Sequence, residues 1–192
     1  PTDGTDRVRG MALADFDELR AHSPADTSVL LPNAGVAIYR SNWNQDASWM
    51  LFKCGEAKAG TGAHAHADNL QILWRRSGWP PLIDPGTPTY NGDQVLRESS
   101  VSTGAHNPSC VDGQSQGMRK SRFSWKTLYR GDGLHVESTS HRWIARGEIR
   151  YPVADTPVTH TRRVECHRDR LTISDSIACE GEHQITLSLL FD

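Results

Sequence analysis

The sequence lacks several features that would assign it to a familiar class of protein. It has four cysteines in 192 residues, and no two of them show the CxxC spacing of zinc knuckles and thioredoxin-like motifs. The formal net charge is −2 and the basic residues are scattered, which excludes the basic surface that nucleic-acid binding requires. No apolar run approaches the roughly 20 residues of a membrane span, and no signal peptide is visible.

Two further absences concern the chain start and the disulfides. The chain begins at Pro1 without an initiator methionine, so we expect it to be part of a longer protein. The nearest cysteines, Cys166 and Cys179, flank the turn "HRDR", but a hairpin there places Cys166 opposite a residue near Leu171. The two cysteines would then be too far apart for a disulfide, and the cysteines do not indicate whether the protein works in an oxidising or a reducing compartment.

Helical signals are equally scarce. The stretch "ALADFDELRAH" places Leu13, Phe16 and Leu19 on one face and predicts a short helix, so residues 1–32 are interpreted as a linker with a remnant helical segment. From residue 33 to residue 192, short runs with strand patterns follow one another, several of them separated by polar turns. We therefore predict an all-β fold, an antiparallel β-sandwich of two sheets. The polar segment from Thr89 to Arg122 is expected to be a long functional loop.

The stretch "GTGAHAHADNLQILW" carries the clearest chemical signal. His64, His66 and Asp68 stand at alternate positions before an apolar run. On a strand these three side chains share one face, with neighbours about 6–7 Å apart. Imidazole and carboxylate groups together are the ligands that a zinc-type ion prefers. The alternative is a surface strand whose histidines have no function.

Two more clusters join this one. "PLIDPGTPTYNGD" places Asp84 at the end of an expected strand, where an acid cannot easily be buried without a partner. "STGAHNPS" places His106 and Asn107 in the polar segment, followed by the turn "VDGQSQ". In order and approximate spacing, these motifs together resemble the C-terminal β domain of the heparinase II/III-like polysaccharide lyases, most strongly from Asn33 to Gln116.

The resemblance implies both a fold and residue roles. Members of the family join an N-terminal helical α/α toroid to a C-terminal antiparallel β-sandwich, with the substrate cleft between them. It implies that His66, Asp84 and His106 bind zinc and that His64 faces the cleft and takes part in catalysis. The sequence departs from the family at Pro88, where members often have an aromatic residue, and this affects substrate choice more than the metal site.

The chemistry of a three-ligand site is consistent with this assignment. An ion bound by three separate segments would stiffen the polar segment, because a structural zinc supplies about 10 kcal/mol of apparent binding free energy. Water would complete the tetrahedron, and Asp68 fits better as an acceptor that orients an imidazole than as a fourth ligand.

The implied reaction is β-elimination on a uronic-acid polymer. A base removes the C5 proton, an acid protonates the leaving O4, and the substrate carboxylate is neutralised. Imidazole titrates near neutral pH, so His64 is expected to act as base or charge stabiliser. Tyr90, Arg97 and Asn107 are candidate substrate-binding residues, for stacking on sugar or pairing with a carboxylate. Without its helical domain the chain is expected to be inactive, and export to the periplasm or beyond is expected by analogy.

Two alternatives come from other classes of protein. A cupin-type oxygenase also places HxH on a strand, but its expected glutamate window here holds Leu70, Gln71 and Ile72. A non-catalytic glycan-binding or structural module is the stronger alternative, because tryptophans can stack on sugars. The six tryptophans are Trp43, Trp49, Trp74, Trp79, Trp125 and Trp143, and we expect most of them in the core. Which glycan is bound and the oligomeric state are left open.

Overall fold

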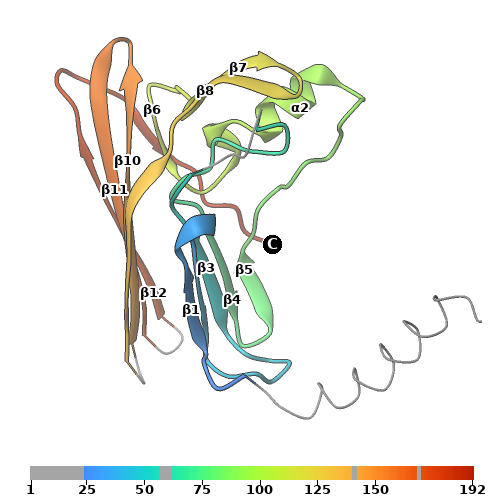
Figure 1. The fold of residues 1–192 in the computed structure, drawn as a ribbon, viewed down its shortest axis with the longest axis vertical. Helices are drawn as coiled ribbons and strands as arrows, with labels where there is room; N and C mark the ends of the chain where they lie inside the picture. Colours follow the sequence, from blue (N-terminus) through green and yellow to red (C-terminus); the bar gives the residue numbers. More distant parts are fainter. Residues whose placement is uncertain (1–23, 57–61, 140–141, 168–169) are drawn as a thin grey trace, which may run out of the picture.

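The computed structural model describes residues 24–56, 62–139, 142–167 and 170–192. Within these ranges, antiparallel strands dominate and helical structure is limited to short segments (Figure 1). The predicted all-β class is therefore confirmed. The helix expected at Ala12–His22 lies outside the described residues. Strand β1 (Ser28–Leu31) already belongs to the first sheet, although it falls within the range interpreted as a linker.

The first sheet contains five strands in the order of the sequence, each antiparallel to the next. Apolar residues at alternate positions explain the central strand, in which Met50 and Phe52 are buried and their neighbours are half-buried. The other strands of this sheet show less regular alternation. The strands are β1, β2 (Val36–Arg40), β3 (Trp49–Lys53), β4 (Ile72–Arg76) and β5 (Trp79–Leu82).

The second sheet contains four strands in the order β12-β11-β10-β9. They are β9 (Gly131–Ser138), β10 (Arg142–Val153), β11 (Thr156–His167) and β12 (Arg170–Ala178). Strands β11 and β12 form a hairpin in which Cys166 lies opposite Leu171, as the turn at "HRDR" predicts. The distant Cys179 therefore cannot reach Cys166 within this hairpin.

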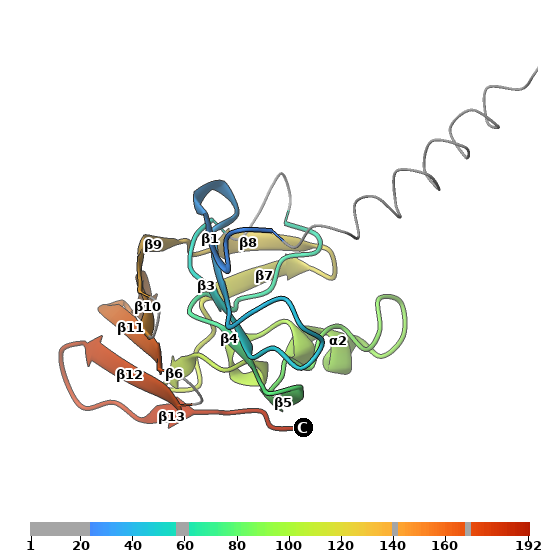
Figure 2. The same cartoon turned by 90° about the horizontal axis from the view of Figure 1, so that it is seen from below.

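The two sheets pack face to face and form the sandwich, visible as separate layers in Figures 1 and 2. Met50, Phe52 and Ile72 from the first sheet meet Trp143 and Val164 from the second in one buried cluster. Two glycines of the second sheet, on β9 and β10, permit close approach of the first sheet. A Cβ at Gly147 would lie 2.4 Å from the sulfur of Cys54, and a Cβ at Gly131 would lie 2.6 Å from it. Side chains at these two positions would push the layers apart.

The polar segment expected as one long loop is more ordered than the sequence predicts. It contains α2 (Gln94–Ser100), the 3-10 turn η2 (Thr103–Ala105), β6 (Ser109–Val111) and β7 (Gly117–Ser121). Asp93 caps α2 by accepting hydrogen bonds from the backbone N–H groups of Val95 and Leu96. The hairpin of β7 with β8 (Ser124–Leu128) follows. The loop prediction was wrong for these stretches, because short polar elements lack the apolar periodicity that reveals longer ones.

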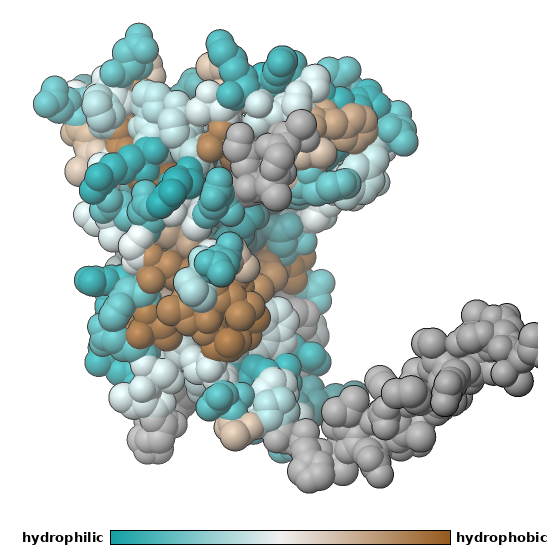
Figure 3. Space-filling model, in the orientation of Figure 1, coloured by the Kyte–Doolittle hydropathy of each residue, from teal (hydrophilic) through white to brown (hydrophobic). Residues whose placement is uncertain are grey.

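The C-terminal strand is shorter than its alternating pattern suggests. Only β13 (Ile185–Leu187) pairs with another strand, β6, and both of its apolar ends are exposed. A second exposed apolar area consists of Val29, Leu30 and Leu31 on β1, and Figure 3 shows apolar side chains gathered over this strand. Among the helices in the described part of the chain, none has the length and apolar character needed to cross a membrane.

Candidate metal centre

His66 lies on an irregular segment that precedes β4, not on a strand. The prediction that His64, His66 and Asp68 share one strand face was therefore wrong. Backbone bonds from this segment run to other elements instead: the N–H of Ala67 donates to the carbonyl of Val101 at 2.9 Å, and the indole of Trp125 donates to the carbonyl of Ala65 at 3.2 Å. The segment is held from both sides of His66, which fixes where this imidazole lies.

Asp84 follows β5 and has the partners that a half-buried acid requires. One of its carboxylate oxygens accepts from the backbone N–H of Gly86 at 2.8 Å. The other lies 2.6 Å from Nδ1 of His106 and accepts from the Gln71 side chain at 2.8 Å. Burial raises the pKa of Asp84, but the hydrogen bond and charge of His106 outweigh it and keep the pKa below its usual value. Asp84 is therefore a carboxylate at neutral pH.

His106 follows η2 and is fully buried. Its backbone N–H donates to the carbonyl of Thr103 at 3.1 Å, and the Thr103 hydroxyl in turn donates to the carbonyl of Ala67 at 2.7 Å. The η2 turn thus connects the His106 segment directly to the His66 segment. The Nε2 atom of His106 is buried without a hydrogen-bond partner.

The structure brings the three predicted ligands together. One ligand atom from each of His66, Asp84 and His106 lies within 4.8 Å of the others. The two imidazole rings are 5.2 Å apart between centroids. These residues come from three segments separated by more than a dozen positions each, so only the tertiary fold can unite them.

The electrostatics of this cluster suit a cation. Burial lowers the pKa of His66 to about 4, so its imidazole is neutral and a lone pair is available at physiological pH. Two imidazoles and a carboxylate are a donor set that zinc accepts, and the unpartnered Nε2 of His106 indicates a polar group that an ion would satisfy. The residues present therefore fit a zinc-type ion, although other divalent ions accept the same donors.

The partner predicted for an imidazole is Asp68, but this aspartate pairs elsewhere. Its carboxylate lies 2.5 Å from the ammonium of Lys53 on β3. The hydroxyl of Thr87 instead lies 3.0 Å from Nε2 of His66. The only sequence signal for Thr87 is its place in "DPGT", three residues after Asp84.

Gln71 is a second residue that the sequence reasoning missed. Its buried side chain donates to Asp84, as described above, and its Oε1 accepts from the backbone N–H of Asn107 at 2.7 Å. Gln71 therefore bridges the Asp84 and His106 segments. In the sequence, Gln71 is notable only because a cupin would have a glutamate in this region.

The other predicted site residues divide into two groups. His64 is exposed and meets Tyr90 edge to face, with 5.8 Å between ring centroids. The guanidinium of Arg97 lies 5.3 Å from the centroid of Tyr90 and within 3.4 Å of the Thr87 hydroxyl. Arg97 is only 1% exposed, although its Nε and Nη2 have no hydrogen-bond partner. His64, Tyr90 and Arg97 thus form one group next to His66.

Asn107 belongs to the second group, inside the protein. Its amide donates to the carbonyls of Ile72 and Ile83 at 2.8 and 3.1 Å, and its Oδ1 accepts from the N–H of Leu190 at 2.9 Å. Because the side chain is fully buried and its donors are used, we assign Asn107 a structural role rather than the predicted contact with substrate.

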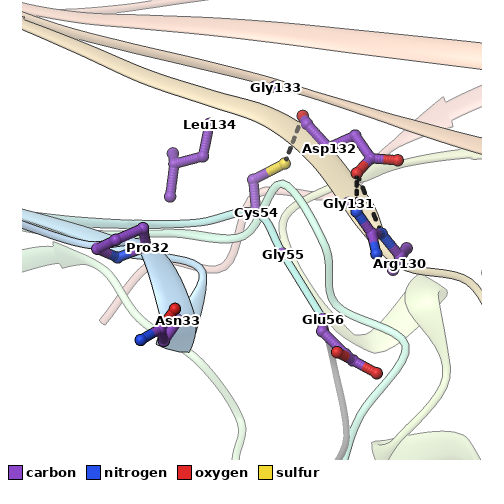
Figure 4. A pocket seen from close by; sticks show the side chains of 10 residues that line it. All are labelled: Pro32, Asn33, Cys54, Gly55, Glu56, Arg130, Gly131, Asp132, Gly133 and Leu134. Carbon is purple, nitrogen blue, oxygen red and sulfur yellow. Dashed lines mark hydrogen bonds and ion pairs between the residues drawn. The ribbon is translucent and has the colours of Figure 1, made fainter.

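A pocket of about 370 Å³ lies away from these residues, and none of the predicted site residues lines it. Figure 4 shows the thiol of Cys54 directed at the carbonyl of Asp132, 3.3 Å away, beside the ion pair of Arg130 with Asp132. Burial raises the pKa of Cys54 to about 11, so this thiol is not a reactive nucleophile at neutral pH. The Cys54 thiol therefore offers this pocket no nucleophile.

Comparisons with known proteins agree with the fold. The family model of heparinase II/III-like C-terminal domains matches residues 23–192. Heparan sulfate lyase HepC from Pedobacter heparinus is a similar solved structure, with a TM-score of 0.68 and 20% identity, covering 96% of this chain and 29% of that one. A structure of heparinase III has a TM-score of 0.66 and 18% identity, covering 88% of this chain and 25% of that one. The chain thus spans less than a third of either structure. No curated protein matches it.

Proposed function

Since this chain belongs to the family of heparinase II/III-like C-terminal domains, we propose that it is the metal-binding β-sandwich of a polysaccharide lyase. The substrate class would be a glycan that contains uronic acid. The convergence of His66, Asp84 and His106 beside the exposed His64 is the observation that carries the proposal. The family match favours this function over the cupin-type oxygenase.

In the proposed reaction, His64 is the catalytic residue of this chain. It is exposed, it belongs to the same short segment as the ligand His66, and it is not itself part of the ligand cluster. In β-elimination it would take the C5 proton or stabilise the charge that develops when that proton leaves. Tyr90, in contact with the His64 ring, would supply a flat surface for a sugar ring.

Arg97 would provide positive charge next to the substrate carboxylate. Its guanidinium lies against Tyr90, and its unpaired nitrogens carry no compensating carboxylate contact. Neutralising the carboxylate makes the C5 proton more acidic. Zinc, when bound by His66, Asp84 and His106, would supply a fixed charge and a cross-link between their segments.

Most of the enzyme is proposed to lie in another domain. The chain covers 29% of HepC and 25% of the heparinase III structure, which leaves room for a helical α/α toroid that completes the cleft. We expect the β-sandwich alone to show negligible turnover. Because such polymers are extracellular, the protein would act in the periplasm or outside the cell.

An absorbance assay for unsaturated uronate ends tests the lyase function. Heparan sulfate, hyaluronan and alginate are each incubated with the full-length protein, with its His64→Ala variant and with this chain alone. We expect activity on one glycan from the full-length protein, a loss of at least about a hundredfold in the variant, and none from the chain alone. Strong turnover by the isolated chain would refute the two-domain requirement.

A non-catalytic glycan-binding module is the second candidate. Trp43 and Trp79 favour it, because they are 40% and 63% exposed while Trp125 and Trp143 are buried. The same His64→Ala variant separates the two functions. Full activity in that variant would favour binding, and Trp79→Ala would then weaken retention on immobilised glycan.

A further inference from the structure

Arg162 on β11 is a fully buried cation that contacts both histidine-bearing segments of the metal centre. Its Nη1 donates to the main-chain carbonyl of Leu70 at 3.0 Å and to that of Asn107 at 2.8 Å. Leu70 lies four residues after His66, and Asn107 directly follows His106. One guanidinium nitrogen of the second sheet thus holds the backbone of two segments that carry metal ligands.

Asp175 on the neighbouring strand β12 fixes the orientation of this guanidinium. Nε and Nη2 of Arg162 donate to the two carboxylate oxygens, each at 2.7 Å, and His160 Nε2 lies 2.7 Å from the same carboxylate. Burial raises the pKa of Asp175, but the hydrogen bonds from His160 and Arg162 outweigh it and hold the pKa far below its usual value. Because Nε and Nη2 are both bound to Asp175, Nη1 is left to donate to the carbonyls of Leu70 and Asn107.

The carbonyl of Leu70 is part of an unusual backbone conformation. Leu70 has a φ of 72°, a left-handed value that is uncommon for a residue other than glycine. Such a conformation persists where surrounding contacts over-determine it. The N–H of Leu70 donates to the carbonyl of Lys53, and the carbonyl of Leu70 accepts from Arg162, so these two bonds supply those contacts. The next residue is Gln71, which bridges Asp84 to Asn107. Arg162 therefore holds the backbone next to Gln71 and the backbone of Asn107, the two residues joined by the Gln71–Asn107 hydrogen bond.

We propose that Arg162, oriented by Asp175, is a positioning residue that sets the separation of the His66 and His106 segments and thereby the affinity for the metal ion. This inference rests on the proposed metal-binding function of the site. An ordinary buried ion pair would change the free energy of unfolding and leave the metal affinity of the folded protein unchanged. A positioning residue changes both, because outer contacts orient metal ligands.

Competition with a chromophoric chelator tests this in the full-length protein, with zinc as the probe. Arg162→Met is expected to weaken zinc binding about 10- to 100-fold, the usual effect of losing contacts behind metal ligands. Arg162→Lys keeps the positive charge but loses the planar guanidinium, and its zinc affinity should lie between those of the parent and Arg162→Met. Arg163→Met is the matched control. It removes the neighbouring arginine, whose partner is Glu165 at 2.7 Å, and should bind zinc like the parent.

Circular dichroism establishes that each variant is folded before its affinity is measured. Asp175→Asn replaces Arg162→Met if the latter does not fold, because it weakens the anchor and leaves the guanidinium in place; a loss of about tenfold is then expected. Equal zinc affinity in all folded variants and the parent would overturn the inference and leave the proposed function intact. A parent that binds no zinc would overturn both.

Discussion

At the scale of single residues, Gln71 shows how a side chain can shape a metal centre without being a ligand. Its amide donates to Asp84 and accepts from the backbone of Asn107, so it joins the segments of two candidate ligands. The bond with Asn107 is buried and the bond with Asp84 is partly buried, so loss of the glutamine leaves the Asn107 N–H without its acceptor. The sequence could not reveal this role, because a glutamine among apolar residues has no motif of its own.

Substituting Gln71 by Leu should therefore destabilise the protein by about 1–3 kcal/mol, since the buried N–H of Asn107 loses its acceptor while Asp84 keeps His106 and Gly86 as partners. Zinc affinity should fall as well, because Asp84 would lose a hydrogen bond that orients it. Urea unfolding and zinc titration measure the two effects. Gln114→Leu is the surface control, because Gln114 is exposed, and it should change neither quantity appreciably.

Asp175 should make the free energy of unfolding depend on pH. Its pKa is lower in the folded state than in the unfolded chain, where it is about 3.9, so Asp175 contributes stability above that value. As the pH falls below about 4, the unfolded chain takes up this proton first and the contribution declines. Urea unfolding between about pH 5 and pH 2 should show a smaller pH slope for Asp175→Asn than for the parent. Identical slopes would contradict the paired state of this carboxylate.

At the scale of elements, the strands were predictable where one face of each is apolar. The alternation in "SWMLFKC" gives β3, and the polar turn at "HRDR" gives the register that sets Cys166 against Leu171. The strand predicted for "HAHAD" was wrong: its polar residues also alternate, but the segment pairs with neither sheet. Its path depends instead on distant bonds such as that between Trp125 and Ala65, which no local pattern encodes.

The close packing of Gly147 against Cys54 yields a prediction for β10. A Cβ at residue 147 would lie 2.4 Å from the sulfur, so Gly147→Ala must displace either the strand or the thiol. We expect a loss of about 1–3 kcal/mol in the free energy of unfolding, measured with urea. Gly104→Ala serves as the control, because an added Cβ there meets nothing within 4 Å. Equal stability of both variants would show that the packing of Gly147 against Cys54 is loose enough to accept a methyl group.

At the scale of the whole molecule, the candidate metal centre joins three loop segments that belong to neither sheet. The ligand set could be predicted through resemblance, since motifs identify His66, Asp84 and His106. The contacts that hold the ligand segments in place could not be predicted, because Arg162 is nearly a hundred residues away from His66 in sequence. Long-range contacts of this kind become visible only when the two layers are assembled.

Removal of the ion should lower the stability of the whole domain. At a free zinc concentration of about one hundred times the dissociation constant, binding adds about 2.7 kcal/mol, which corresponds to about 5–10 °C in Tm. Thermal unfolding with zinc and with a chelator measures this shift. His66→Ala should lose the shift and His64→Ala should retain it, because only His66 belongs to the ligand cluster. A shift that survives in His66→Ala would place the ion elsewhere.

The exposed stretch from Tyr90 to Leu96 lies between Asp84 and His106 in the sequence. It is an accessible place for a protease to nick the polypeptide. The fragments on either side would still share the Asp84–His106 contact, the Gln71 bridge and any ion bound there. A cut in this stretch should therefore leave two pieces that migrate as one particle on a gel-filtration column and separate only in denaturant.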